Sequence, residues 1–216
     1  MSRSVRIELP DAVLEGDLEV PAGAEGLVVF AHGSGSSRHS PRNRFVARWL
    51  QQTGLGTLLM DLLTAEEGEI DDQTREMRFD IGLLGRRVAQ TIEWVGGRKD
   101  TAKLGIGLFG ASTGAAAALV AAAELPQDAV RAVVSRGGRP DLAGNALPLV
   151  RCPVLLIVGG EDDIVIGLNE QAKGQMACTV DLAIVPGATH LFEEPGTLEK
   201  AADLAAAWFC RYLPAQ

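Results

Sequence analysis

Short apolar runs, separated by longer stretches of mixed polarity, form the dominant pattern of this chain. Six of the runs are rich in β-branched residues, at 26–31, 56–60, 104–109, 129–135, 154–159 and 180–185. Strands that are buried on both faces of a parallel sheet show this continuous apolar character. Upstream of them, residues 4–9 and 13–20 alternate apolar and polar positions, which is typical of a half-exposed antiparallel hairpin. The pattern therefore predicts eight strands.

Helices are predicted between the runs, at 41–52, 72–95, 112–124, 167–177 and 197–213. Pro41 in a first helical turn and Thr197 as an N-cap are start signals, and no full capping box is recognised. Strands that alternate with helices indicate an α/β fold, with helices on both faces of a mostly parallel sheet of about eight strands. The chain has neither an internal repeat nor a low-complexity linker, so residues 1–216 are expected to form a single domain.

Composition and charge exclude several classes of partner. Apolar residues make up 47% of the chain and charged residues 22%, which is enough apolar material for a sizeable core. The 28 acidic residues outnumber the 20 basic ones, and a net charge of −8 repels nucleic acids and anionic membrane surfaces. No apolar stretch reaches the ~18 residues that a membrane span needs. We therefore expect no nucleic acid and no membrane as a partner.

The three cysteines, Cys152, Cys178 and Cys210, are odd in number and lack CxxC spacing, so they predict neither a disulfide framework nor a zinc site. The N-terminal residues have no apolar segment behind their arginines, unlike a secretory signal. Together these features lead us to expect a cytoplasmic protein.

Two further patterns resemble a cofactor-binding motif and a metal site, and we interpret neither of them as a binding site. Residues 105–110 match GxGxxG, but in a dinucleotide-binding fold the glycines follow a strand, whereas here the apolar residues lie inside the motif. Glu161, Asp162 and Asp163 are consecutive carboxylates, yet adjacent side chains on a turn rarely converge on a metal without other ligands. We expect no cofactor and no metal.

The chemistry of the chain centres on residues 110–114, GASTG, which directly follow an apolar run and open an alanine-rich helix. A GxSxG sequence between a strand and a helix is the context of a nucleophile elbow, in which a strained turn presents the serine hydroxyl above the sheet. Small residues two before and two after Ser112 let the strand and the helix approach each other. The alternative interpretation of Ser112 is a small residue in a tight turn.

A serine nucleophile needs a base that is oriented by a carboxylate, and both follow along the chain. The run 154–159 leads into GGEDDIV, which holds Asp162 and Asp163, and the run 180–185 leads into PGATH, which ends at His190. Each candidate follows the carboxyl end of a predicted parallel strand, where open α/β sheets build their sites. Of the other histidines, His32 is expected to order its loop and His39 to be solvated.

These residues resemble the α/β-hydrolase superfamily and, within it, the dienelactone-hydrolase-like branch. The resemblance covers nearly the whole chain and rests on HGSG at 32–35, GASTG at 110–114, GGEDxxV at 159–165 and PGATH at 186–190. One departure is that the dienelactone hydrolases proper carry cysteine at the nucleophile position, where this chain has Ser112. Activity on dienelactones is therefore not carried over with the resemblance.

The resemblance implies an α/β-hydrolase fold with little or no lid, because only residues 137–149 occupy the place where many relatives insert one. It implies Asp162 as the acid, because similar proteins place that acid three residues after the first glycine of the turn and three before its valine. Asp163 and Asp141 are the other candidates. The oxyanion hole is expected to use the backbone amides of Thr113 and Ser34, with Gly35 as the alternative to Ser34.

The function that these residues predict is a serine hydrolase of small-molecule carboxylic esters or lactones, with Ser112, His190 and Asp162 as its catalytic triad. Two alternatives stay open: an acyltransferase or thioesterase with the same triad, and a non-catalytic binding protein of the hydrolase fold. The chain is expected to act as a monomer or a homodimer.

Arginines gather in the loops at the predicted catalytic edge: Arg38 and Arg42 follow one strand, and Arg136 and Arg139 follow another. Guanidinium groups bind carboxylates and phosphates through paired hydrogen bonds, so Arg38, Arg136 and Arg139 are candidates for contact with an anionic substrate group. The preferred interpretation is that Arg136 or Arg139 pairs with an acidic residue, Asp141, Glu66 or Glu67, and braces the loops.

Overall fold

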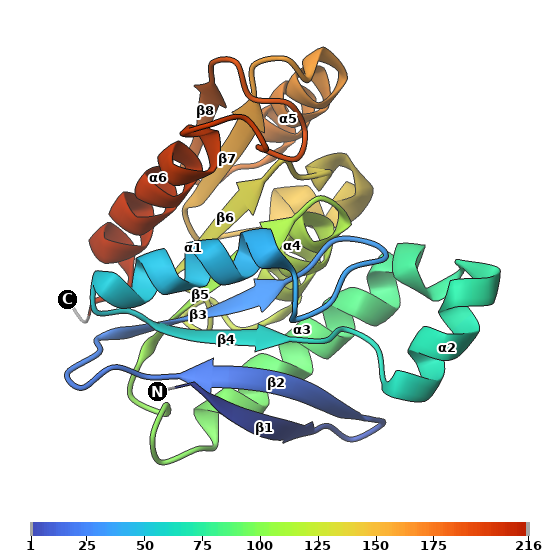
Figure 1. Ribbon diagram of the computed structural model, residues 1–216, viewed down its shortest axis with the longest axis vertical. Coiled ribbons are helices and arrows are strands. Elements are labelled where there is room, and N and C mark those ends of the chain that lie inside the picture. The colour runs from blue at the N-terminus through green and yellow to red at the C-terminus, as the bar shows by residue number, and fades with distance from the viewer. Residues whose placement is uncertain (1, 215–216) are drawn as a thin grey trace.

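Eight strands lie side by side in one sheet, in the order β1-β2-β4-β3-β5-β6-β7-β8, in the computed structural model, which describes residues 2–214 (Figure 1). The strands are β1 (Arg3–Glu8), β2 (Val13–Glu19), β3 (Gly26–Ala31), β4 (Gly56–Met60), β5 (Gly105–Ala111), β6 (Ala132–Arg136), β7 (Val154–Gly159) and β8 (Val180–Val185). The hairpin β1-β2 joins β4 in antiparallel fashion, and every later pairing is parallel. The predicted mostly parallel sheet is confirmed.

Helices cover both faces of the sheet. On one face lie α1 (Pro41–Gln52) and α6 (Thr197–Tyr212), which contact each other in front of the sheet in Figure 1. On the other lie α3 (Ile81–Gly96), α4 (Thr113–Glu124), η2 (Pro140–Leu149) and α5 (Asp163–Gln175), joined by contacts from α3 to α4 and from η2 to both α4 and α5. Within residues 2–214, each helix is too short or too polar to cross a bilayer.

Two apolar layers form the core, one on each side of the sheet. Under α1 and α6, Phe30 and Phe109 pack with ring centroids 4.9 Å apart, and Phe209 of α6 joins them. On the opposite side, α4 is buried along most of its length, and its alanines allow neighbours to approach closely. A Cβ atom at Gly85 of α3 would lie 2.7 Å from Cγ1 of Val120 of α4, so this contact requires glycine.

The single helix predicted at 72–95 is wrong. The structure has α2 (Ala65–Thr74), a short 3-10 helix η1 (Met77–Phe79) and then α3. Thr64 and Glu67 form a full capping box at the start of α2, so the expectation of no full capping box is wrong. Arg75, with φ of 59°, ends α2 in a left-handed conformation, and Asp80 caps α3 by accepting from the amide of Leu83.

Smaller differences concern where elements begin. The cap of α6 is Gly196, with φ of 81°, while the Thr197 hydroxyl donates to the carbonyl of Glu194. Helix α5 starts at Asp163, four residues before the predicted start at 167. Strand β6 starts at Ala132 rather than 129, because Ala129 closes a turn onto the carbonyl of Pro126. None of these shifts moves a candidate residue away from the carboxyl edge of the sheet.

Candidate active site

Ser112 stands between β5 and α4 with φ of 51° and ψ of −123°, a conformation that is strained for any residue except glycine. The flanking glycines make this turn possible. A Cβ atom at Gly110 would lie 2.3 Å from Cα of Ala115, and one at Gly114 would lie 2.2 Å from the carbonyl oxygen of Ala31. The steric reason predicted for the GxSxG spacing is confirmed, because both clashes are with backbone atoms that cannot give way.

Neighbouring backbone holds the turn in place. The amide of Ser112 donates to the carbonyl of Arg136 at 3.3 Å, and the carbonyl of Ser112 accepts from the amide of Arg139 at 3.0 Å. The end of β6 thereby fixes the nucleophile turn from the side. Strain at Ser112 is maintained because the surrounding hydrogen bonds determine its backbone on both sides.

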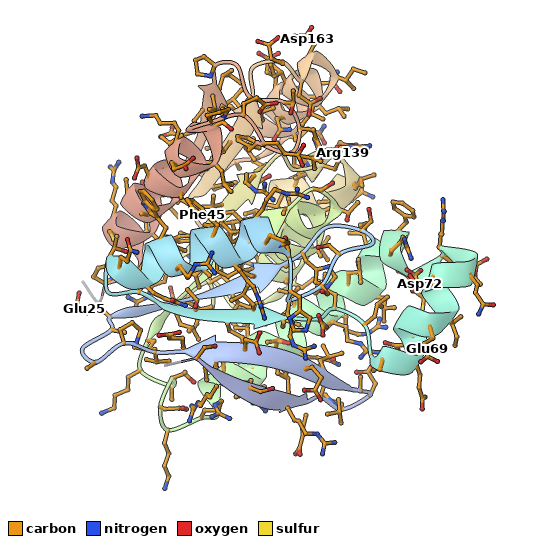
Figure 2. All side chains as sticks on the ribbon, viewed as in Figure 1. Glu25, Phe45, Glu69, Asp72, Arg139 and Asp163 are labelled. Carbon is orange, nitrogen blue, oxygen red and sulfur yellow. The ribbon has the colours of Figure 1, made fainter. Side chains whose placement is uncertain are left out.

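His190 and Asp162 come together from two loops. Nδ1 of His190 lies 2.7 Å from Oδ2 of Asp162, and their side chains are 38% and 17% exposed. This contact assigns the proton to Nδ1, as donor to the carboxylate, which leaves Nε2 as an acceptor. Asp163 is exposed and lies at the outer end of the molecule in Figure 2, while Asp141 bonds Arg139, so Asp162 is the carboxylate that the structure brings to His190.

Close backbone contacts position the histidine loop. The amide of Glu161 donates to the carbonyl of Ala188 at 2.9 Å, which ties the acid turn to the loop. Gly137, with φ of 51°, lies beside the histidine: a Cβ atom there would lie 2.9 Å from the carbonyl oxygen of His190 and 3.7 Å from Cε1 of its ring. Glu194 accepts from the amide and the hydroxyl of Thr189 at 3.0 and 2.6 Å, and these bonds lower the pKa of the Glu194 carboxyl.

A cavity of about 120 Å³ brings the candidates together. Its lining includes Ser112, His190 and Arg136, together with Gly33 and Ser34 from the loop after β3. A larger cavity of about 730 Å³ lies along residues 33–41 of the same loop and extends to α2 and η1. A substrate whose reacting carbonyl sits in the small cavity therefore has room for a larger group beside it.

Ser34 and Thr113, whose amides are expected in the oxyanion hole, contact each other through the Thr113 side chain. The Ser34 amide donates to Oγ1 of Thr113 at 2.8 Å, so it already has an acceptor. It can serve an oxyanion only by sharing or giving up this bond. Gly33 lies against the nucleophile, since a Cβ atom there would be 3.1 Å from Cβ of Ser112, and Gly35 follows with φ of 68°. The loop from Gly33 to Gly35 is therefore the wall that faces the serine.

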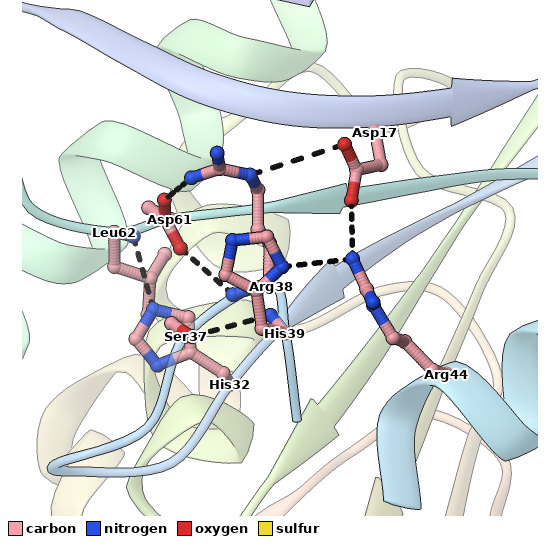
Figure 3. Close-up of polar contacts among 8 residues, drawn as sticks. All are labelled: Asp17, His32, Ser37, Arg38, His39, Arg44, Asp61 and Leu62. Carbon is pink, nitrogen blue, oxygen red and sulfur yellow. Dashed lines mark hydrogen bonds and ion pairs between the residues drawn. The ribbon is translucent and has the colours of Figure 1, made fainter. Parts of the chain in front are cut away.

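His32 orders this loop, as predicted. Its Nδ1 lies 2.9 Å from the carbonyl oxygen of Gly33, and its Nε2 accepts from the amide of Leu62 at 3.1 Å (Figure 3). In the neutral imidazole, Nδ1 donates a hydrogen bond and Nε2 accepts one, so both ring nitrogens have a partner. Burial lowers the pKa of His32, in accord with this arrangement. His39 is exposed, as predicted, with Nδ1 2.8 Å from Nη2 of Arg44.

The arginines at the catalytic edge differ in their partners. Arg38 forms an ion pair with Asp61, whose Oδ1 also accepts from the Arg38 amide at 2.7 Å (Figure 3). Arg139, labelled in Figure 2, binds Asp141 through Nε and Nη2 at 2.8 and 2.7 Å, which confirms the bracing interpretation for Arg139. Arg136 has no carboxylate partner among residues 2–214.

Two residues of the site were not recognised in the sequence. Asn43 is buried in the first turn of α1 and turns Oδ1 toward Nη2 of Arg136 at 3.5 Å. Phe192 is buried with φ of 56°, and its ring centroid lies 5.7 Å from Cζ of Arg136. A buried polar residue at an inward position of an amphipathic helix is the one available signal for Asn43, and the sequence carries none for Phe192.

The acidic turn at 161–163 is not part of a group of metal-ligating side chains among residues 2–214. Across residues 2–214, no three or more His, Cys, Asp or Glu side chains are grouped so as to hold a metal ion. Of the three carboxylates, Asp162 faces His190 and Asp163 begins α5 on the exposed side.

Comparison with curated proteins gives two relatives from Mycobacterium tuberculosis, strains CDC 1551 / Oshkosh and ATCC 25618 / H37Rv. Both are provisionally named phosphoribosyl transferases, and each is 57% identical over 198 residues, which are 92% of this chain and 44% of that protein. The chain therefore spans less than half the length of these relatives.

Solved structures include a dienelactone hydrolase from Anabaena variabilis ATCC 29413, which is 57% identical, with a TM-score of 0.97 over 99% of this chain and 98% of that chain. Est1E from Butyrivibrio proteoclasticus shares the fold at 15% identity, with a TM-score of 0.79 over 96% of this chain and 98% of that chain. The sequence model of the dienelactone hydrolase family matches residues 14–212. With the strand order, the elbow and these matches in agreement, the chain belongs to the dienelactone hydrolase family and has the α/β-hydrolase fold.

Proposed function

We propose that this chain is a serine hydrolase of small-molecule carboxylic esters or lactones. One observation carries the proposal: the strained Ser112 and His190 line one cavity, and the Nδ1 atom of His190 is 2.7 Å from Asp162. Family membership supports a hydrolase in general. The ester or lactone specificity rests on the serine nucleophile and on the larger cavity beside it, which has room for a small-molecule acyl or alcohol group.

In the proposed reaction, Ser112 Oγ attacks the acyl carbon while Nε2 of His190 accepts the hydroxyl proton. Asp162 holds the imidazole in the tautomer with Nδ1 protonated and stabilises the imidazolium that forms. The carbonyl oxygen becomes an oxyanion, for which the amide of Thr113 is the first donor and the amide of Ser34 or Gly35 the second. His190 then returns its proton to the leaving alkoxide, which departs as the alcohol.

Hydrolysis of the acyl-enzyme completes the cycle. Water gives a proton to Nε2 of His190 and attacks the acyl carbon, and the collapse of the second tetrahedral intermediate releases the acid and restores the Ser112 hydroxyl. A lactone follows the same path, except that the leaving alkoxide stays attached to the acyl group. No metal or cofactor enters this scheme.

The name of the Mycobacterium tuberculosis relatives suggests a different activity, phosphoribosyl transfer. That name describes proteins of which this chain matches 44%. The residues gathered around Ser112 favour acyl chemistry, because a serine, a histidine and a carboxylate in series are the parts of a nucleophilic acyl transfer.

The experiment that tests the proposal is a panel of aryl esters, alkyl esters and lactones, assayed with wild type and with Ser112→Ala. We expect turnover of at least one ester or lactone, and a loss of at least ~10³-fold in kcat for Ser112→Ala. Release of acid and alcohol in equal amounts, even with added alcohols or amines, supports hydrolysis over acyl transfer. Wild-type turnover by purified Ser112→Ala would overturn the proposal.

A further inference from the structure

The loop between β3 and α1 is held at both ends by the two residues that follow β4. At its start, Nε2 of His32 accepts from the amide of Leu62 at 3.1 Å. Toward its end, Oδ1 of Asp61 accepts from the amide of Arg38 at 2.7 Å, and Oδ2 of Asp61 pairs with Nη1 of the same arginine (Figure 3). Residues 33–37 therefore run between two fixed points that belong to adjacent residues of the chain.

This stretch contains the wall that faces the nucleophile. A Cβ atom at Gly33 would lie 3.1 Å from Cβ of Ser112, so the loop lies directly against the serine. Residues 33–36 form one turn and residues 37–40 a second, each closed by a backbone hydrogen bond. Both candidates for the second oxyanion donor lie in the first turn, and the Arg38 amide lies in the second. Because the two turns are consecutive, a shift of the second turn moves the first.

Asp61 is placed to fix the main chain of this loop. Its own amide donates to the carbonyl of Glu15 at 2.9 Å, which ties it to β2. Its carboxylate binds a backbone amide of the loop, and a charged acceptor makes that bond stronger than a neutral one would. The Arg38 guanidinium adds a second contact and lies between two acids, since its Nε is 3.9 Å from Oδ1 of Asp17. The Asp61 side chain is only 19% exposed, so solvent screens these contacts little.

We propose that Asp61 is a positioning residue of the hydrolase: by holding the Arg38 amide, it keeps the second oxyanion donor at the distance from Ser112 that the reaction needs. This inference rests on the proposed serine-hydrolase function and assigns to it a further residue outside the triad. Asp61 lines the larger cavity and Ser112 the smaller one, and the loop that lines both cavities transmits the effect. Oxyanion donors act over a narrow range of distance, so a misplacement of about 1 Å costs about 10²-fold in rate.

Glu67 provides a matched control elsewhere in the chain. One of its carboxylate oxygens accepts from the Thr64 amide at 2.8 Å and the other from Nη2 of Arg87 at 2.8 Å, so it joins a backbone amide and a guanidinium as Asp61 does. Its side chain is 24% exposed, close to the value for Asp61. These bonds hold the start of α2 against α3, and not the loop beside Ser112.

The experiment compares Asp61→Ala, Asp61→Asn and Glu67→Ala with 4-nitrophenyl acetate as the substrate. Asp61→Ala is expected to lower kcat about 10- to 100-fold and to change KM less than about 3-fold, because the oxyanion donor acts in the transition state. Asp61→Asn should recover part of the loss, since its side-chain oxygen can still accept from the Arg38 amide. Glu67→Ala should melt at a lower temperature than wild type, as Asp61→Ala does, and keep kcat within about twofold of the wild-type value.

Hydrogen exchange, followed by mass spectrometry of peptides, provides a second readout that does not need turnover. The amides of residues 33–40 should exchange faster in Asp61→Ala than in wild type, while the strands on either side keep their wild-type rates. In Glu67→Ala the same loop should exchange at the wild-type rate. A general loss of stability would instead speed exchange in the loop and the strands together, in both variants.

Faster exchange confined to residues 33–40, together with a lower kcat, supports the proposal. Unchanged exchange of this loop, wild-type kcat in Asp61→Ala, or an equal loss of kcat in Glu67→Ala would overturn it. If Asp61→Ala does not fold, Asp61→Asn against Glu67→Gln decides by the same criteria. If wild type cleaves no ester, the hydrolase proposal fails, and the exchange measurement alone decides whether Asp61 holds the loop.

Discussion

Nδ1 of His190 lies 2.7 Å from Oδ2 of Asp162, although the two residues are in loops that follow different strands, β8 and β7. The loops meet because the strands are parallel neighbours in the sheet and both end at the same edge. Gly159 permits the contact, since a Cβ atom there would lie 2.4 Å from the carbonyl oxygen of Ala188. The orientation of the imidazole is therefore a product of strand order and of a glycine at the end of β7.

Replacing the acid should separate Asp162 from its neighbour. We expect Asp162→Asn to lower kcat on the order of 10⁴-fold, because an amide favours the wrong imidazole tautomer and cannot stabilise the imidazolium. Asp163→Asn is the matched control, since Asp163 is exposed at the start of α5. Steady-state kinetics on one activated ester, with unfolding curves for both variants, measure the difference. A greater loss in Asp163→Asn at equal stability would contradict the assignment.

Gly137 should control the position of the histidine. A side chain there would approach the His190 carbonyl, so we expect Gly137→Ala to lower kcat at least ~10-fold by displacing the imidazole. Gly144→Ala is the control: its φ of 49° is close to the 51° of Gly137, but no atom lies within 4 Å of the added methyl group. Both variants place an alanine at a positive φ, which should cost each of them about 1–3 kcal/mol of unfolding free energy. Equal kcat in the two would show that contact with His190 is irrelevant.

The elbow glycines should determine stability as well as activity. In Gly114→Ala the added methyl group would meet the carbonyl oxygen of Ala31 at 2.2 Å, so we expect a loss of about 3 kcal/mol or more in unfolding free energy. Gly167→Ala, in α5 with open space around it, should instead gain about 0.5–1 kcal/mol from helix propensity. Urea unfolding followed by tryptophan fluorescence gives both values. A tolerated Gly114→Ala would mean that the strand and helix can move apart.

His32 should make stability depend on pH. Its pKa is lowered from 6.5, so the unfolded chain takes up a proton at a higher pH than the folded chain does. Its contribution is complete above 6.5 and is lost as the pH falls from there through the folded value. We expect unfolding free energy to fall between pH 7.5 and 5.5 less steeply in His32→Gln than in wild type. Parallel slopes in the two proteins would contradict the role of a neutral, doubly hydrogen-bonded His32.

The sequence predicted the sheet well because its strands are short apolar runs with clear borders. The helix at 72–95 went wrong because the acidic, weakly amphipathic segment around α2 lacks an apolar stripe, and its start signal is the capping pair Thr64 and Glu67. A left-handed residue at Arg75, where no glycine stands, gave no sign of the break. Local signals at the helix ends, and not the hydrophobic period, decide this region.

At the site, the sequence indicated Ser112 because the elbow is a local pattern. It indicated His190 because a histidine is expected after the acid in the order of the triad. The contacts of Arg38 and Arg136 come from distant parts of the chain, while the partner of Arg139 is local. Asp61 neutralises Arg38 from the end of β4, and Asp141 neutralises Arg139 from two residues away, whereas Arg136 lies against Asn43 and Phe192 from distant segments. Only the packed structure separates Arg136, which has no carboxylate partner among residues 2–214, from Arg38 and Arg139, which do.

Reaction with a fluorophosphonate probe, followed by mass spectrometry of the intact protein and its peptides, tests the serine-hydrolase account most directly. An activated serine is labelled, while an ordinary hydroxyl is spared, because the probe requires a nucleophile with an adjacent base. We expect one adduct per chain, located on Ser112, absent in Ser112→Ala and formed far more slowly in His190→Gln. Unlabelled wild type, or an adduct on another residue together with full turnover by Ser112→Ala, would contradict the account.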